Sequence, residues 1–211
     1  FYALKLIDPL GARPFDKDRR GMSVGEGAAM LLLVADDSRN AVAELLGAGL
    51  SCDAYHPTAP HPEGRGAYAA MVSAIDDAGL AAADVDYINL HGTGTPDNDL
   101  AEARAVMRLF GDRPPPVSSL KGAAGHPLAA AGALAAVTAA ICIDAHLIPA
   151  NTGACHPDPE LRLTPVTRPR RAALGTVLVN SFGFGGNNAA VVIGAPAAER
   201  QRAVADVPWP M

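Results

Sequence analysis

The sequence predicts an α/β fold in which short strands and helices alternate along the chain. Residues 85–90 (VDYINL) form an apolar run of strand length that leads directly into a loop with two glycines. Residues 64–79 carry apolar side chains at every third or fourth position, which is the spacing of an amphipathic helix. Alternation of such segments favours a layered α/β sandwich over a helical bundle.

Two strands are expected before this helix. Residues 27–34 (GAAMLLLV) are a continuous apolar run of strand length, and residues 41–49 form a second candidate. The helix over 64–79 is expected to end at Gly79, because glycine readily adopts the left-handed conformation found at helix C-caps.

The next two elements are the strand over 85–90 and a helix over 100–110. Asp97 or Asp99 can cap this helix, since a short carboxylate accepts hydrogen bonds from the free N–H groups of a first turn. Gly111 marks the expected end of the helix.

The C-terminal part continues the alternation. A short strand is expected at Val117, after three prolines, and then a long alanine-rich helix within 123–148. Residues 174–180 and 189–194 are expected to be strands on either side of a loop over 181–188. The expected order is strand, strand, helix, strand, helix, strand, helix, strand, strand.

Composition excludes several classes of function. The 211 residues suffice for a domain with a hydrophobic core, and a net charge of −5 argues against a nucleic-acid-binding surface. Three cysteines are too few for a disulfide scaffold, so free thiols in a reducing cytoplasm are expected. The run 123–148 contains Pro127 and Asp144 and is too polar for a membrane span, so a buried helix is expected there. No charged-then-apolar segment follows Phe1, so no secretory signal is expected, and the chain is expected to be part of a longer protein.

Four loops combine glycines with polar residues at the ends of expected elements, where α/β enzymes place their sites. They are 13–27, 91–96 (HGTGTP), 118–126 (SSLKGAAGH) and 180–188 (NSFGFGGNN). Singly, each has a structural explanation, because a lone histidine is usually hydrogen-bonded within the fold and loop glycines usually supply a positive φ. No loop completes the G-x-G-x-x-G pattern of a dinucleotide site, and no Cys or His pair has zinc-ligand spacing, so neither a cofactor nor a metal is expected.

The combination of loops is far more specific than any one of them. The strings HGTGTPxND, KxxxGH and NSFGFGGNNA occur in this order after RPFDxxRxGxxxGEGAA. Together they resemble the β-ketoacyl-acyl carrier protein synthases, condensing enzymes of the thiolase-like fold, over about residues 12–194. The resemblance implies that residues 1–211 are the C-terminal half of the layered αβαβα sandwich of that fold.

The resemblance also implies roles for individual residues. His91 and His126 match the two histidines of the Cys-His-His synthases, which hold the thioester carbonyl of the malonyl extender and assist its decarboxylation. Imidazole N–H donors suit this role, because the carbonyl oxygen becomes enolate-like as carbon dioxide leaves. Lys121 resembles the lysine that fixes the second histidine, and Glu102 resembles the carboxylate partner of that lysine.

Further residues match the substrate-binding positions of the family. Thr93 and Thr95 resemble the residues that hydrogen-bond the phosphopantetheine arm of an acyl carrier protein. Phe184 resembles a gating phenylalanine whose backbone N–H also lines the oxyanion hole, although without the resemblance it would be interpreted as core. The remaining expected substrate-site residues are Phe182, Gly183 and Gly185.

The nucleophile of the family is missing from this chain. Cys52, Cys142 and Cys155 each match a non-catalytic stretch, whereas the family uses a Cys at a helix N-terminus. That Cys is expected in an N-terminal half absent from this chain, so residues 1–211 alone are expected to be inert.

The expected activity is decarboxylative Claisen condensation of an acyl group with malonyl-acyl carrier protein, in fatty acid, polyketide or aryl polyene biosynthesis. The implied partners are an acyl carrier protein, the N-terminal half, and a second synthase subunit in a homodimer or heterodimer. The alternative is a non-catalytic subunit of the chain-length-factor kind. The joint presence of His91, Lys121 and His126 argues against this alternative. A third interpretation, a thiolase acting on coenzyme A esters, fits the HGTGTP and KxxxGH strings less well.

Overall fold

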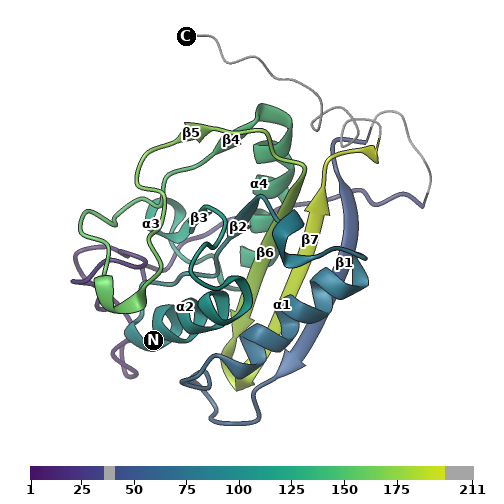
Figure 1. Cartoon of the computed structure of the whole chain (residues 1–211). Coiled ribbons are helices and arrows are strands. Elements are labelled where there is room, and N and C mark those ends of the chain that lie inside the picture. Colours follow the sequence, from purple (N-terminus) through teal and green to yellow (C-terminus); the bar gives the residue numbers. More distant parts are fainter. Residues whose placement is uncertain (36–40, 198–211) are drawn as a thin grey trace.

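A five-stranded mixed sheet is the central layer of the computed structural model, which describes residues 1–35 and 41–197 (Figure 1). In spatial order its strands are β1 (Glu44–Cys52), β7 (Asn187–Gly194), β6 (Thr176–Gly183), β2 (Tyr87–Asn89) and β3 (Val117–Ser118). Strand β2 runs parallel to β3 and β6, whereas β7 is antiparallel to β1 and β6. The predicted α/β class is confirmed.

Helices cover both faces of this sheet. On one face lie α1 (Arg65–Asp77) and α2 (Pro96–Phe110), and on the other lies α4 (Ala131–Ala145) (Figure 1). Successive side chains of β6 point to opposite faces of the sheet. Leu178 joins the core cluster under α1 and α2, while Val177 and Val179 join the cluster under α4. Burial on both faces explains why this strand is apolar at successive positions.

Helix α2 begins four residues earlier than expected. Its first residue is Pro96 and its N-cap is Thr95, so neither Asp97 nor Asp99 is the cap. Proline suits the first helical position for two reasons. Its φ is already helical, and the N–H that it lacks would have no partner within the helix at this position. The helix ends before Gly111, as expected.

The alanine-rich region is not one continuous helix. It divides into α3 (Lys121–Ala124), a 3₁₀ turn (Leu128–Ala130) and α4, because Gly125 has a φ of 69° and Pro127 follows shortly after. The segment Leu128–Ala145 has the length and mean hydropathy (1.9) of a membrane span, and in the structure it packs on β6 and β7.

The expectation that this helix is buried holds for one face only. Four buried residues of α4 pack in the core cluster on the sheet, namely Ala135, Ala139, Cys142 and Ile143. Ala131 is also buried and lines the cavity described below. Most other residues of α4 are half-buried or exposed, because no further layer of described residues covers them.

The expected strand over 27–34 is wrong for this chain. These residues form no ladder with any part of the chain that the structure describes, and their large side chains are exposed, with Met30 at 96% and Leu32 at 90%. An apolar sequence becomes a strand only where a neighbouring strand completes its hydrogen bonds. The segment therefore presents an apolar surface that no residue in the ranges 1–35 and 41–197 covers.

The other expected strands are present with shifted ends. The strand expected over 41–49 is β1, and the loop expected over 181–188 shrinks to the 3₁₀ turn Phe184–Gly186 between β6 and β7. A small second sheet pairs β4 (Leu147–Ile148) with β5 (Arg170–Arg171). The remaining 3₁₀ turns are Ala82–Asp84 and Pro159–Leu161.

Candidate active site

The four candidate loops meet at one cavity of about 1040 Å³. Its lining includes the following predicted residues: His91, Thr93, Thr95, His126, Phe182, Gly183 and Phe184. The 13–27 loop joins the 118–126 loop through a parallel bridge between Val24 and His126. Segments far apart in the sequence thus converge at the end of β2 and the start of α2.

His91 follows β2, and the hydrogen bonds that fix its position are made by main-chain N–H groups. The Glu102 carboxylate, on α2, accepts the N–H of His91 and of Gly92, both at 2.8 Å. The side-chain amide of Asn180, on β6, also donates to Glu102, at 3.0 Å. One buried carboxylate therefore fixes the position of the first histidine against a helix and a strand.

Lys121 contacts His91 rather than His126. Its ammonium group donates to the His91 carbonyl oxygen and lies 3.4 Å from the His91 Nδ1 atom. The expectation that Lys121 fixes the second histidine is therefore corrected. The Glu102 oxygens accept three N–H groups, from His91, Gly92 and Asn180. Burial lowers the pKa of Lys121 to about 8, and the nearby charge of Glu102 opposes this shift.

His126 is oriented by one backbone hydrogen bond to the 13–27 loop and one ring hydrogen bond to the next turn of the chain. Its N–H donates to the Ser23 carbonyl oxygen (2.7 Å), and its Nδ1 atom accepts the N–H of Leu128 (3.2 Å). A ring nitrogen that accepts a hydrogen bond carries no proton, so the proton of a neutral His126 lies on Nε2. The Lys121 ammonium beside Nδ1 of His91 favours the same tautomer there.

Both histidines are neutral at pH 7. Burial, followed by the charges of Lys121 and His126, places the pKa of His91 well below its usual value. Burial, followed by the Lys121 charge, lowers the pKa of His126 to about 4. The two ring centroids lie 5.3 Å apart with the planes at 80°. Two neutral N–H donors this close together can both bind a single oxygen on which negative charge develops.

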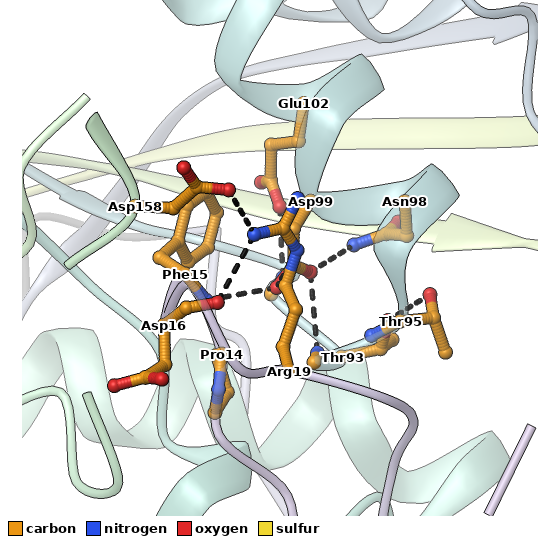
Figure 2. A network of polar contacts seen from close by, with 12 residues as sticks. Pro14, Phe15, Asp16, Arg19, Thr93, Thr95, Asn98, Asp99, Glu102 and Asp158 are labelled. Atoms are coloured by element: carbon orange, nitrogen blue, oxygen red, sulfur yellow. Dashed lines mark hydrogen bonds and ion pairs between the residues drawn. The ribbon is translucent and has the colours of Figure 1, made fainter. Parts of the chain in front are cut away.

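The two threonines lie beside this pair, at the N-terminus of α2. The Thr93 and Thr95 hydroxyl oxygens are 2.8 Å apart, and both side chains line the cavity. The Gly94 N–H between them donates to Asp99 (3.2 Å). Asp99 also accepts the N–H of Phe15 at 2.8 Å, so this buried carboxylate is a structural part of the site (Figure 2).

Sequence reasoning treated Asp99 only as a possible helix cap. A signal was present, because Asp99 and Glu102 are three residues apart and therefore lie on one face of α2. Two acidic residues on a face that packs inward require hydrogen-bond donors, and here backbone N–H groups of the 91–96 loop provide them.

The two phenylalanines occupy different environments. Phe182 is half-buried on β6, with its ring 5.7 Å from that of His91. Phe184 is 45% exposed in the β6–β7 turn and lines the cavity. Gly185 has a φ of 81° and donates its N–H to the Pro57 carbonyl oxygen, and it does not line the cavity.

None of the three cysteines, all within the described ranges, lines the cavity or forms a disulfide. Cys142 lies inside α4, where burial raises the pKa of its thiol to about 11, the opposite of what a nucleophile requires. Ligand atoms of Asp16, Asp18 and His156 approach within 4.8 Å outside the cavity. Both Asp16 oxygens accept backbone N–H groups of Asp18 and His156, so this group braces two loops.

Comparison with known proteins agrees with this arrangement. Residues 42–154 match the family model of the C-terminal domain of β-ketoacyl synthases. The 3-oxoacyl-acyl-carrier-protein synthase 2 of Synechocystis is 44% identical over 190 residues, which are 86% of this chain and 46% of that protein. The corresponding synthase 2 of Mycobacterium tuberculosis is 40% identical over 89% of this chain and 46% of that protein. The chain thus spans about half the length of the curated relatives it matches.

Solved structures give the same result. The ishigamide ketosynthase/chain length factor superposes with a TM-score of 0.88 at 40% identity, over 92% of this chain and 49% of that one. A type II polyketide ketosynthase in complex with its acyl carrier protein (AntDE:AntF) has a TM-score of 0.80 at 26% identity, over 92% and 52%. The layered sheet with its helices is therefore that of a thiolase-like condensing enzyme. The chain belongs to the β-ketoacyl synthase family, and its residues 42–154 match the C-terminal domain of these synthases.

Proposed function

We propose that this chain supplies the histidines and the lysine of the active site of a β-ketoacyl-acyl carrier protein synthase. The observation that carries the proposal is the pair of neutral rings, His91 and His126, on one wall of one cavity. Each ring has a hydrogen-bond donor at Nδ1, which leaves its Nε2–H free for substrate. Lys121 positions His91, and Glu102 holds the loop on which His91 lies.

The proposed reaction requires this arrangement of donors. The bond between the α-carbon and the carboxylate of a malonyl thioester breaks, carbon dioxide leaves, and the electron pair is shared between the α-carbon and the thioester oxygen. Two Nε2–H donors aimed at that oxygen stabilise the enolate, at about 3–4 kcal/mol for each donor in comparable sites. The α-carbon then attacks an enzyme-bound acyl thioester, and the thiolate leaves. The step consumes no redox equivalent, so no cofactor is proposed.

The acyl thioester must be formed on a Cys outside this chain. We place that Cys in an N-terminal half, with residues 1–211 as the C-terminal half, because the chain spans 46% of its relatives and none of its own cysteines reaches the cavity. The uncovered segment 27–34 and the open face of α4 supply apolar surface for contact with that half.

The proposed partners follow from the cavity and from the relatives. Thr93 and Thr95 face it with hydroxyl groups that suit the amides of a phosphopantetheine arm on an acyl carrier protein. Phe184, exposed at the cavity, is proposed as the gate. Relatives that bind an acyl carrier protein or combine a ketosynthase with a chain length factor support a carrier partner and a second synthase subunit. We also propose a homodimeric or heterodimeric synthase in the cytoplasm, where the three free cysteines would stay reduced.

A second candidate is the non-catalytic chain-length-factor-like subunit, which the ishigamide relative keeps open. The buried placement of Lys121 against His91 favours the catalytic subunit. A buried ammonium group costs free energy, and a subunit without chemistry gains nothing from it.

The proposal is tested by condensation in the complete synthase. Acyl-carrier and malonyl-carrier are mixed with enzyme, and the β-ketoacyl product is measured by mass spectrometry. The expected result is product with the wild type and with the surface control His156→Ala, and none with the double variant His91→Ala, His126→Ala. Product at the wild-type rate from the double variant contradicts the proposal.

A further inference from the structure

Arg19 is a buried cation that joins three separate parts of the chain (Figure 2). Its side chain is only 9% exposed. One terminal nitrogen lies 2.5 Å from the Asp158 carboxylate and donates to the main-chain oxygen of Asp16 at 3.0 Å. The Nε atom lies 3.9 Å from the Asp99 carboxylate and has no hydrogen-bond partner among the described residues.

Asp99 transmits this contact to the 91–96 loop. One of its oxygens accepts the N–H of Phe15, and the other accepts the N–H of Gly94. Gly94 has a φ of 83°, and a Cβ there would lie 2.7 Å from the Gly21 carbonyl oxygen, so the loop and the 13–27 segment touch at this point. Arg19 and Gly94 are thus connected through one buried carboxylate.

The charge of Arg19 matters because Asp99 is fully buried. A buried carboxylate needs an opposite charge and several donors to remain ionised. An ionised carboxylate can accept both backbone N–H groups, whereas a protonated one donates at one oxygen and loses part of this capacity. Of these two hydrogen bonds, the one from Gly94 is the longer, at 3.2 Å against 2.8 Å for Phe15. It is therefore the one more easily lost when the guanidinium is removed.

We propose that Arg19 is a positioning residue that holds Thr93 and Thr95 in their substrate-binding arrangement through its ion pair with Asp99. The inference rests on the proposed role of the two threonines in binding the carrier arm. Arg19 is the second arginine of the RPFDxxR string, and it does not line the cavity. The inference gives this residue a function although it lies outside the cavity.

The test compares Arg19→Gln with the matched control Arg162→Gln in the complete synthase. Arg162 pairs with Asp112 at 2.9 Å, but both side chains are exposed, at 72% and 86%, so the control removes an ion pair of no structural weight. Amide hydrogen exchange of the peptide that contains Gly94 is measured, together with KM and kcat for malonyl-carrier. Arg19→Lys is included as the conservative variant.

Arg19→Gln is expected to raise exchange at Gly94 about tenfold. The KM for malonyl-carrier should rise about tenfold, with kcat for decarboxylation within about twofold of the wild type. Arg19→Lys should recover part of both losses, and Arg162→Gln should change neither. If Arg19→Gln does not fold, Asp158→Asn, which removes one partner and keeps the charge at Asp99, is expected to give a smaller change of the same kind.

The outcomes separate the inference from the proposed function. Unchanged exchange at Gly94 in Arg19→Gln, or in Asp158→Asn where the first variant does not fold, overturns the role of Arg19. Raised exchange at Gly94 with an unchanged KM supports the role of Arg19 in holding the 91–96 loop, and it contradicts the role proposed for Thr93 and Thr95 in binding the carrier arm. Equal losses in KM and kcat that Arg19→Lys does not recover show a general defect of folding and also overturn the inference.

Discussion

Replacement of His126 by alanine removes one of the two proposed donors to the enolate oxygen. His126 is half-buried at the cavity, and its Nδ1 atom accepts the Leu128 N–H, so its Nε2–H is the donor that is lost. Loss of one such donor costs about 3–4 kcal/mol, which corresponds to a 10²- to 10³-fold slower decarboxylation. Acylation of the nucleophilic Cys should remain, because it does not use this donor.

The assay measures carbon dioxide release from malonyl-carrier and, separately, acyl transfer to the Cys by mass spectrometry. His126→Gln is the matched control, because the glutamine amide nitrogen can take the place of Nε2 and should keep part of the rate. Loss of acyl transfer in His126→Ala, or equal decarboxylation rates for the Ala and Gln variants, would show that His126 is not a donor to the enolate oxygen.

The pH dependence gives an independent check of the same residue. The pKa of His126 lies at about 4, below its ordinary value of about 6.5, so the ring stays neutral from pH 5 to pH 8. His126 should therefore contribute no inflection near pH 6.5. Burial raises the pKa of Glu102 to about 7, so an inflection from Glu102 should appear in the wild type and in His126→Gln alike. An acid limb centred there, absent from His126→Gln, would show that the ring titrates normally and is not desolvated.

Three further predictions follow from the same geometry. Lys121→Met removes the positive charge beside His91, so the pKa of His91 should rise toward its usual value; a histidine titration by NMR measures this, and an unchanged titration would contradict the contact. Phe184→Ala should raise malonyl decarboxylation in the absence of an acyl primer, and a wild-type level would show that this ring only packs. Residues 1–211 expressed alone should aggregate through the apolar segment 27–34, and a monomer with one sharp thermal transition would argue against a missing half.

Local sequence signals predicted most elements of the fold but not their ends. The strands β6 and β7 and the helix α1 follow from apolar spacing, which depends on a core that this chain itself provides. The strand expected over 27–34 is wrong because no described strand lies beside this segment to complete its hydrogen bonds. An apolar run reports burial, but only a neighbour decides which secondary structure results.

The site was predicted from motif order rather than from chemistry visible in single residues. The strings around His91, Lys121 and His126 indicated which loops matter, and the structure brings these loops to one cavity. The partner of Lys121 was assigned wrongly, since sequence spacing cannot show that its side chain points back to the first histidine. Arg19 and Asp99 were missed because their contact joins positions 80 residues apart in the chain.

Whether both histidines bind one thioester oxygen can be seen in a crystal structure of the complete synthase with a malonyl-pantetheine analogue that cannot lose carbon dioxide. The thioester oxygen of the analogue is expected about 2.7–3.1 Å from the Nε2 atoms of both His91 and His126. An analogue bound in the cavity with that oxygen out of reach of either ring would contradict it.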